Sequence, residues 1–416
     1  MATCKESRTI WSELWGDGRT TATAGVCFLL IAALASLIQI YTTRNRPGLR
    51  SIPGPFLASV SNLDRLWSCF RGQQMKHHLR LHDRYGPLSE VYDMFHLDGT
   101  PTLFSERDET AHRVKKRPVA AAYSMGTMKE LEPMNDECSA ILTAKLDGLV
   151  GGEVDLGSWL HWFAFDVITT IAFFNRLGFI EACGDVQGVI GALKTRVKYV
   201  SMVGQAPHLH KWLAGNPLLS LYSNKYWIER VLNKIISPFR DPESLNPAGY
   251  LIGFITQQVQ RRESKDSSTM QFRDLLGRIK RFKDGEEVMG DKELMSHAAA
   301  NVLAGSDTTA TTLRALFYYL CRTPAAYDKL LAEIDEAERA GRLSDPVTFE
   351  EAQQLKYFQA VIKEAMRMHP ALGLLLERVV PKEGADIGGV WLPGGTVIGM
   401  NPWVEARDRS VYGEDA

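Results

Sequence analysis

Residues 296–322 read SHAAANVLAGSDTTATTLRALFYYLCR, and this stretch decides which fold the chain can adopt. Its apolar and small residues recur at helical spacing, which predicts a long and mostly enclosed helix whose buried face holds Ala298, Val302, Leu313, Leu316, Phe317 and Leu320. The middle of the stretch interrupts this pattern. Gly305 costs about 1 kcal/mol relative to alanine in a helix interior, and residues 306–309 are short polar side chains that compete for backbone hydrogen bonds.

Two interpretations fit this polar interruption, and the spacing alone leaves both open. In the first, the helix loosens beside a cavity, Gly305 lets a ligand approach the backbone, and the acid and alcohol of Asp307 and Thr308 relay protons. In the second, a helix begins at Ser306, with Asp307 as an acid in its first turn. The first interpretation requires a helix that runs past Gly305, and the second requires a helix start there.

The sequence AGSDTT at 304–309 resembles the oxygen-activating motif on the long central helix of the cytochrome P-450 monooxygenases. Further motifs of that family follow in the expected order, and the chain is similar in type to the fungal, pisatin-demethylase-like group. The resemblance implies a mainly α fold, a helical domain with small β-sheets, in which Ala304 and Gly305 lie against a haem (heme) cofactor. It also implies that Asp307 and Thr308 are the catalytic residues, which deliver the protons that split dioxygen.

The composition excludes several other classes of protein. With 416 residues, 45% hydrophobic residues and a net charge of -1, the chain can bury a large core and lacks the basic surplus typical of proteins that bind nucleic acid. Its six cysteines are scattered without a C-x-x-C pair, which argues against a zinc site or a disulfide scaffold. No linker-like stretch interrupts residues 61–416, so we expect one domain there.

Residues 20–43 carry no charge and are long enough to span a bilayer, which predicts one transmembrane helix behind an N-terminal flank at 1–19. A cleaved signal peptide is the alternative, since the sequence ALA at 33–35 imitates a cleavage site. Arginines cluster directly after the span, so by the positive-inside rule the rest of the chain faces the cytosol. The basic segment 44–60 is also rich in proline, and the resemblance implies a hinge there that orients the domain on the endoplasmic reticulum membrane, against membrane lipid.

Basic residues in two places are candidate partners of the haem propionates. His112 and Lys116 lie four apart on one face of a predicted helix, and the resemblance implies that these two positions hold one propionate. The family usually has arginine at the second position; a lysine cannot make the two-pronged contact, so Arg117 is a further candidate. Arg378 is implied as a partner of the second propionate. The alternatives are a basic surface turn around Lys116 and a strand-edge surface charge at Arg378.

An apolar, buried-looking helix is predicted to carry Glu364 and Arg367, three apart on one face. The pattern is weak on its own, because Glu336 and Arg339 repeat it in a charged, surface-like helix. The resemblance implies that Glu364 and Arg367 form a structural ion pair beneath the haem, in a buried site that needs a third, arginine partner. Further on, residues 388–400 alternate β-forming residues around a Pro-Gly-Gly turn, which predicts a hairpin.

The last expectation concerns the iron ligand. The family binds haem iron through a cysteine thiolate in a glycine-rich loop, and in this sequence no cysteine follows Cys321. Cys321 lies on the same predicted helix as Thr308, roughly 20 Å further along its axis at about 1.5 Å per residue, so it cannot sit across a haem from Thr308. We therefore expect a domain that is incomplete at its C-terminus, with no metal ligand and no thiolate-ligated haem in the chain as written.

Two functional hypotheses follow. The first is a truncated, inactive relative of the family, either a decaying gene product or a haem-free interaction partner, and this is the state expected for the chain as written. The second is an active, haem-dependent monooxygenase of fungal secondary metabolism that takes electrons from an NADPH-cytochrome reductase, with the end of its sequence lost. Residues 198–230 are rich in apolar side chains where the family has the roof over the substrate, which implies a small apolar substrate.

Overall fold

The computed structural model describes residues 34–35, 38, 41–42, 102–106, 109–203, 247–264, 274–279, 282–283, 286–287, 289–373, 376–387 and 390–414. The chain divides into two compact units, of which one holds Met1–Pro87 with Val379–Val397 and the other holds Leu88–Arg378 with Ile398–Ala416. The predicted anchor and hinge at 20–60 lie outside the described residues, apart from the few anchor positions given above, which are helical.

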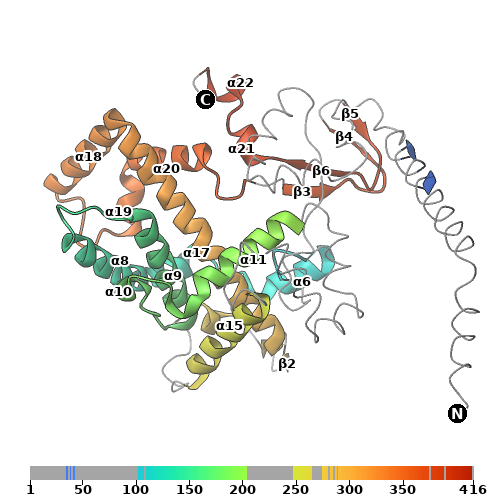
Figure 1. The fold of residues 1–416 in the computed structure, drawn as a ribbon, viewed down its shortest axis with the longest axis horizontal. Helices are drawn as coiled ribbons and strands as arrows, with labels where there is room; N and C mark the ends of the chain where they lie inside the picture. The colour runs from blue at the N-terminus through green and yellow to red at the C-terminus, as the bar shows by residue number, and fades with distance from the viewer. Residues whose placement is uncertain are drawn as a thin grey trace, which may run out of the picture. The chain divides into compact units, whose positions relative to one another are not determined.

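The described part of the chain is mainly helical, as the sequence predicts (Figure 1). The α-helices are α6 (Glu109–Val119), α7 (Met125–Glu130), α8 (Glu132–Asp147), α9 (Leu156–Phe173), α10 (Phe179–Ala182), α11 (Val189–Val203), α15 (Pro247–Ser264), α17 (Asp291–Arg322), α18 (Pro324–Arg339), α19 (Phe349–Gln354), α20 (Lys356–Met368), α21 (Pro402–Glu405) and α22 (Arg409–Tyr412). Two 3-10 turns join them, η2 (Val186–Gly188) and η4 (Leu276–Arg278). The strands are short: β1 (Phe282–Lys283), β2 (Glu286–Glu287), β3 (Leu376–Val379), β4 (Ala385–Ile387), β5 (Val390–Leu392) and β6 (Val397–Met400).

Helix α17 is continuous over 32 residues and runs past Gly305, as the first interpretation requires. The predicted loosening at its middle and the alternative helix start at Ser306 are both wrong. The short polar side chains do not compete with the helix because they bond to its own carbonyl groups. Ser306 Oγ donates to the carbonyl oxygen of Val302 at 2.7 Å, and Thr308 Oγ1 donates to that of Ala304 at 2.6 Å. These bonds to the preceding turn satisfy the hydroxyl groups and leave the backbone ladder in place.

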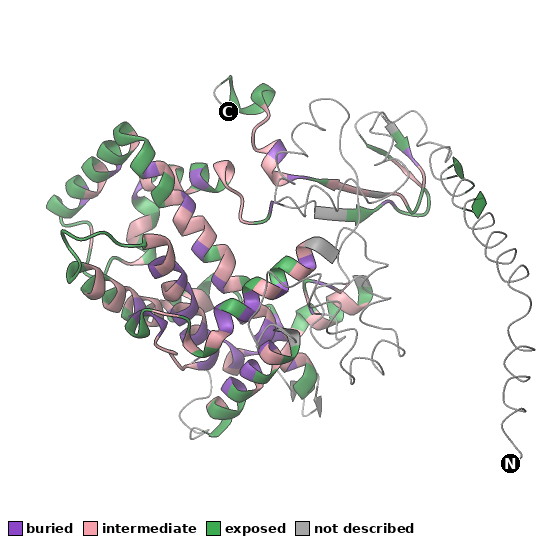
Figure 2. Cartoon of the chain, viewed as in Figure 1, coloured by how far each residue is buried: buried purple, intermediate pink, exposed green. Residues whose placement is uncertain are grey.

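The core of the larger unit lies around α9 and α17, which pack against each other, and the contacts at the two ends of this seam show that they run antiparallel. At one end of the seam Arg314 Nε of α17 donates to the carbonyl oxygen of Gly157 of α9 at 2.7 Å. At the other end Ile168 of α9 lies against Gly305 of α17. The aromatic residues Trp159 and Phe165 of α9 are 7% and 0% exposed, and the buried residues concentrate on these helices (Figure 2).

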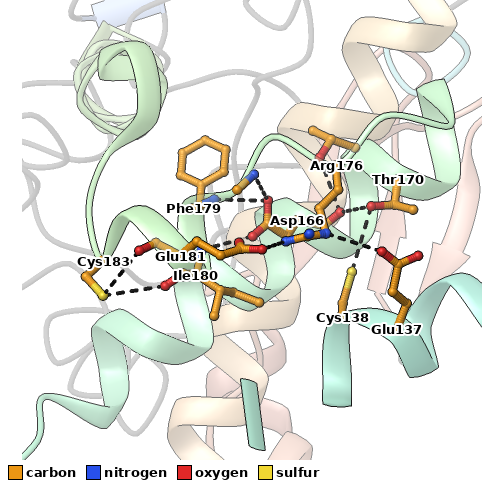
Figure 3. A network of polar contacts seen from close by, with 11 residues as sticks. Glu137, Cys138, Asp166, Thr170, Arg176, Phe179, Ile180, Glu181 and Cys183 are labelled. Carbon is orange, nitrogen blue, oxygen red and sulfur yellow. Dashed lines mark hydrogen bonds and ion pairs between the residues drawn. The ribbon is translucent and has the colours of Figure 1, made fainter. Parts of the chain in front are cut away.

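The corner between α9 and α10 is held by one buried carboxylate, Asp166 (Figure 3). Its oxygens accept backbone N–H bonds from Gly178 at 2.8 Å, Phe179 at 3.1 Å and Ile180 at 2.9 Å, which are the orphan donors at the start of α10. Burial raises the pKa of the Asp166 carboxyl above its usual value, and the three N–H bonds oppose part of that rise. This cluster is structural, since it fixes the chain reversal that follows the core helix.

The described strands pair as β1 with β2, β3 with β6 and β4 with β5. The hairpin predicted over 388–400 is therefore wrong, because β5 and β6 each pair with an earlier strand. The Pro-Gly-Gly turn packs on the segment after β3: a Cβ on Gly394 would lie 2.3 Å from the carbonyl oxygen of Lys382. The Gly395 N–H donates to the carbonyl oxygen of Val380 at 2.9 Å. The glycines thus serve a close approach between two chain segments.

Among the described residues, α9 is the stretch that is long and apolar enough to cross a membrane. However, 56% of its residues are buried inside the protein, as is usual for a core helix. This helix therefore carries no argument for a membrane span, and the anchor predicted at 20–43 rests on the sequence.

Candidate functional site

The candidate catalytic motif lies on the central part of α17. Ala304 and Thr308 are four residues apart and therefore share a face of the helix. Ala304 is exposed and Thr308 is half-buried, whereas Ser306, on another face, is fully buried in the core. The face that carries Ala304 and Thr308 is thus open on this continuous helix, with the smallest side chain one turn before the hydroxyl group.

Gly305 faces a neighbouring helix. A Cβ at this position would lie 2.9 Å from Cδ1 and 3.0 Å from Cγ1 of Ile168, closer than ordinary van der Waals contact allows. The absence of a side chain at Gly305 is therefore explained by the approach of α9. The sequence interpretation assigned this glycine to the approach of a ligand, and that role stays a prediction.

The carboxylate of Asp307 is held by a residue that the sequence interpretation missed. His161 Nε2 of α9 lies 2.7 Å from Asp307 Oδ1, and the side chains of His161 and Asp307 are 4% and 30% exposed. Because an ionised carboxylate only accepts, Nε2 is the donor of this bond. The signal in the sequence was a single histidine within the apolar stretch of α9, in an i, i+4 relation to the buried Phe165.

Helix α6 presents the predicted propionate partners with different burial. His112 is half-buried, and Lys116 and Arg117 are exposed. Their neighbour Lys115 was not predicted; its Nζ pairs with Glu106 at 2.6 Å and its side chain is 21% exposed. The charge of Lys115 reaches α17, since it is the second cause, after burial, that lowers the pKa of His297.

Arg367 makes a two-pronged contact with Glu364, in which Nε and Nη2 each lie 2.7 Å from a carboxylate oxygen. The predicted burial is wrong for the acid, because the Glu364 side chain is 58% exposed and that of Arg367 is 14% exposed. The hydrogen bond to Arg367 lowers the pKa of Glu364. Arg367 Nη1 also donates to the carbonyl oxygen of Ala406 at 2.5 Å, and its guanidinium lies 5.0 Å from the ring of Tyr412. Besides Glu364, Arg367 therefore contacts the carbonyl oxygen of Ala406 and the ring of Tyr412.

The residues named above fit a haem only in part. The cations Lys116, Arg117 and Arg378 are exposed and suit carboxylates in charge, and Thr308 offers a hydroxyl group on an open helix face.

The family binds haem iron through a cysteine thiolate, and the cysteines that the structure describes are Cys138, Cys183 and Cys321. Burial raises the pKa of the Cys138 thiol to about 11, so it is not a thiolate at neutral pH. Cys183 donates to the carbonyl oxygen of Ile180 at 3.5 Å, and Cys321 lies on α17 itself. The structure therefore does not assign an iron ligand among these three described cysteines.

Comparison with known proteins identifies the family of this chain over most of its length. The family model described as Cytochrome P450 matches residues 73–416. Similar proteins include the cytochrome P450 monooxygenase cicH of Emericella nidulans, 35% identical over 91% of this chain and 80% of its own length. A cytochrome P450 monooxygenase of Aspergillus terreus is 32% identical over 93% of this chain and 83% of its own. The cytochrome P450 monooxygenase gsfF of Penicillium aethiopicum is 30% identical over 94% of this chain and 83% of its own. The chain therefore belongs to the cytochrome P450 family.

Proposed function

We propose that the protein is a haem-dependent monooxygenase of fungal secondary metabolism that oxidises a small apolar substrate. The observation that carries the proposal is the arrangement on α17, where Thr308 shares an open face with Ala304 and directly follows Asp307, whose carboxylate is held by His161. Family membership supports the reaction class, and the fungal relatives are named monooxygenases. The apolar stretch 198–230 is the sequence argument for an apolar substrate.

The haem, when bound, supplies the activation of dioxygen. The residues of this chain would position it and move protons. The Thr308 hydroxyl donates a hydrogen bond to the carbonyl oxygen of Ala304. A rotation about χ1 would turn this hydroxyl toward the open face, where it would serve as a proton donor. Asp307 is 30% exposed and thus has access to solvent protons while it stays next to Thr308. Lys116 or Arg117 would hold one propionate, and Arg378 the other.

The wider setting of the enzyme follows from the sequence. We infer an anchor at 20–43 in the endoplasmic reticulum membrane, with the flank 1–19 before it and the hinge 44–60 after it, so that the domain 61–416 faces the cytosol. Electrons would come from an NADPH-cytochrome reductase, since the family uses a redox partner.

The test is to express the full chain with haem supplied, reduce it with dithionite, add carbon monoxide and record the difference spectrum. A thiolate-type Soret band that scales with protein concentration supports the monooxygenase and contradicts the expectation that the chain as written forms no thiolate-ligated centre. Apoprotein, or haem protein without that band, supports the second candidate, an inactive relative.

In a catalytically active preparation of the protein, Thr308→Ala should divert reducing equivalents to peroxide while substrate still binds, because a proton donor is lost. Unchanged product per NADPH consumed would contradict the role of Thr308. Thr312→Ala is the matched control, since Thr312 Oγ1 also bonds to a carbonyl of its own helix, that of Thr308 at 3.0 Å, one turn further from the motif.

A further inference from the structure

The contact between His161 and Asp307 lies within a seam whose register is fixed on both sides. Arg314 Nε bonds to the carbonyl oxygen of Gly157 at 2.7 Å, four residues before His161 on α9. Ile168 packs onto Gly305, seven residues after His161 and two before Asp307 on α17. These contacts fix the register of α9 against α17, so the imidazole and the carboxylate are held at the positions where they meet.

The imidazole itself has little freedom. Its side chain is 4% exposed, and its ring centroid lies 5.3 Å from that of the fully buried Phe165. Among the described residues, His161 is the side chain that hydrogen-bonds to Asp307. A rigid, buried donor therefore acts on a partly exposed acceptor, and the rotamer of the carboxylate is set from the α9 side.

A bond that served only helix packing would not need an acid at this place. The seam already has the Gly157–Arg314 bond and the Ile168–Gly305 contact for that purpose. The acid is the residue directly before Thr308, and an unheld Asp307 could rotate into solvent, since its side chain is 30% exposed.

We propose that His161 is the positioning residue of Asp307: its Nε2–H keeps the carboxylate of the residue directly before Thr308 in one orientation, ready to exchange protons. This inference rests on the proposed function for its consequence, a proton supply at Thr308. The positioning itself is a property of the two side chains and is measurable without turnover.

The first measurement follows the ring N–H of His161 in the full chain in detergent micelles, by NMR on ¹⁵N-histidine-labelled protein. Wild type should show a slowly exchanging Nε2–H. Asp307→Asn keeps an acceptor oxygen but loses its charge, so it should speed the exchange by less than Asp307→Ala does. Asp307→Ala removes the acceptor and should speed the exchange about tenfold or more, because a hydrogen bond to a charged group contributes about 1.5 kcal/mol or more.

The second measurement follows the side-chain carboxyl ¹³C resonance of Asp307, assigned by its loss in Asp307→Asn. His161→Leu removes the donor and should shift this resonance toward that of an exposed aspartate. His161→Gln carries an N–H at nearly the position of Nε2 and should restore the wild-type value. A merely structural histidine would not give this rescue, and the Gln variant keeps the test valid if the Leu variant is poorly folded.

The proposal is overturned if the His161 N–H exchange is as fast in wild type as in Asp307→Ala, or if the Asp307 resonance is the same in His161→Leu as in wild type. Failure of the proposed function looks different. In that case the NMR results stand as expected, and it is the carbon monoxide spectrum or the Thr308→Ala measurement that fails.

Discussion

Substitution of Gly305 by alanine separates the two explanations of this glycine. In the interior of an exposed helix this change is favourable, because alanine is about 1 kcal/mol better than glycine. In α17 the new Cβ would lie 2.9 Å from Cδ1 and 3.0 Å from Cγ1 of Ile168. If the glycine serves the approach of α9, the change must therefore be less favourable than in an exposed helix, and this must hold in the free protein without any cofactor.

The magnitude follows from two opposing effects. Overpacking of an interface costs about 1 to 3 kcal/mol, and the gain in helix propensity offsets about 1 kcal/mol of it. The free energy of unfolding should thus fall by about 0 to 2 kcal/mol in Gly305→Ala. In an Ile168→Ala background both close atoms are gone and the remaining contact, to Cβ at 3.7 Å, is ordinary. There the same change should stabilise by about 1 kcal/mol.

The assay is urea unfolding of the full chain in detergent micelles, followed by tryptophan fluorescence, for the two single variants and the double variant. The coupling between positions 305 and 168 should be about 1 to 3 kcal/mol, equal to the overpacking cost. Gly253→Ala in α15 is the control, since nothing lies within 4 Å of a Cβ added there. The reasoning is refuted if Gly305→Ala stabilises the wild-type background as much as Gly253→Ala does.

Three further predictions concern structural side chains. Asp166→Asn should lower the free energy of unfolding by about 1 to 3 kcal/mol, read from the urea midpoint, because the Ile180 N–H loses its acceptor in a buried site. Arg367→Lys should cost about 1 kcal/mol, through loss of the two-pronged contact and of the Ala406 carbonyl, whereas Arg342→Lys, in an exposed pair, should change little. Bonds from Ser344 and Thr348 lower the pKa of Glu351 from 4.5 to about 2, so its stabilisation is present above pH 4.5 and is lost as the pH falls through about 2. The difference in melting temperature between wild type and Glu351→Gln should shrink over that window.

Several features of the protein were readable from the sequence because they depend on local spacing. Helical periodicity predicted α17, and the motif at 304–309 pointed to the family. Glu364 and Arg367, three apart on one face, lie where they can meet, and they do.

Local spacing was misleading where a neighbouring segment altered the outcome. The pattern around Gly305 predicted a loosened helix or a helix start, but the adjacent hydroxyl groups bond within the helix and α9 fills the space above the glycine. The alternation at 388–400 predicted a hairpin, but β5 and β6 found partners earlier in the chain. In both cases the propensity was local and the stronger stabilisation came from packing between segments.

By itself, the sequence determined the helical class, the family and the candidate proton-relay residues Asp307 and Thr308, since these depend on residue types at short spacing. Only the tertiary structure decided what holds Asp307. His161 is 146 residues away along the chain, and no periodicity relates residues at that separation. Their contact exists because two apolar helices pack in one register, and that register depends on the shapes of all the side chains along the seam.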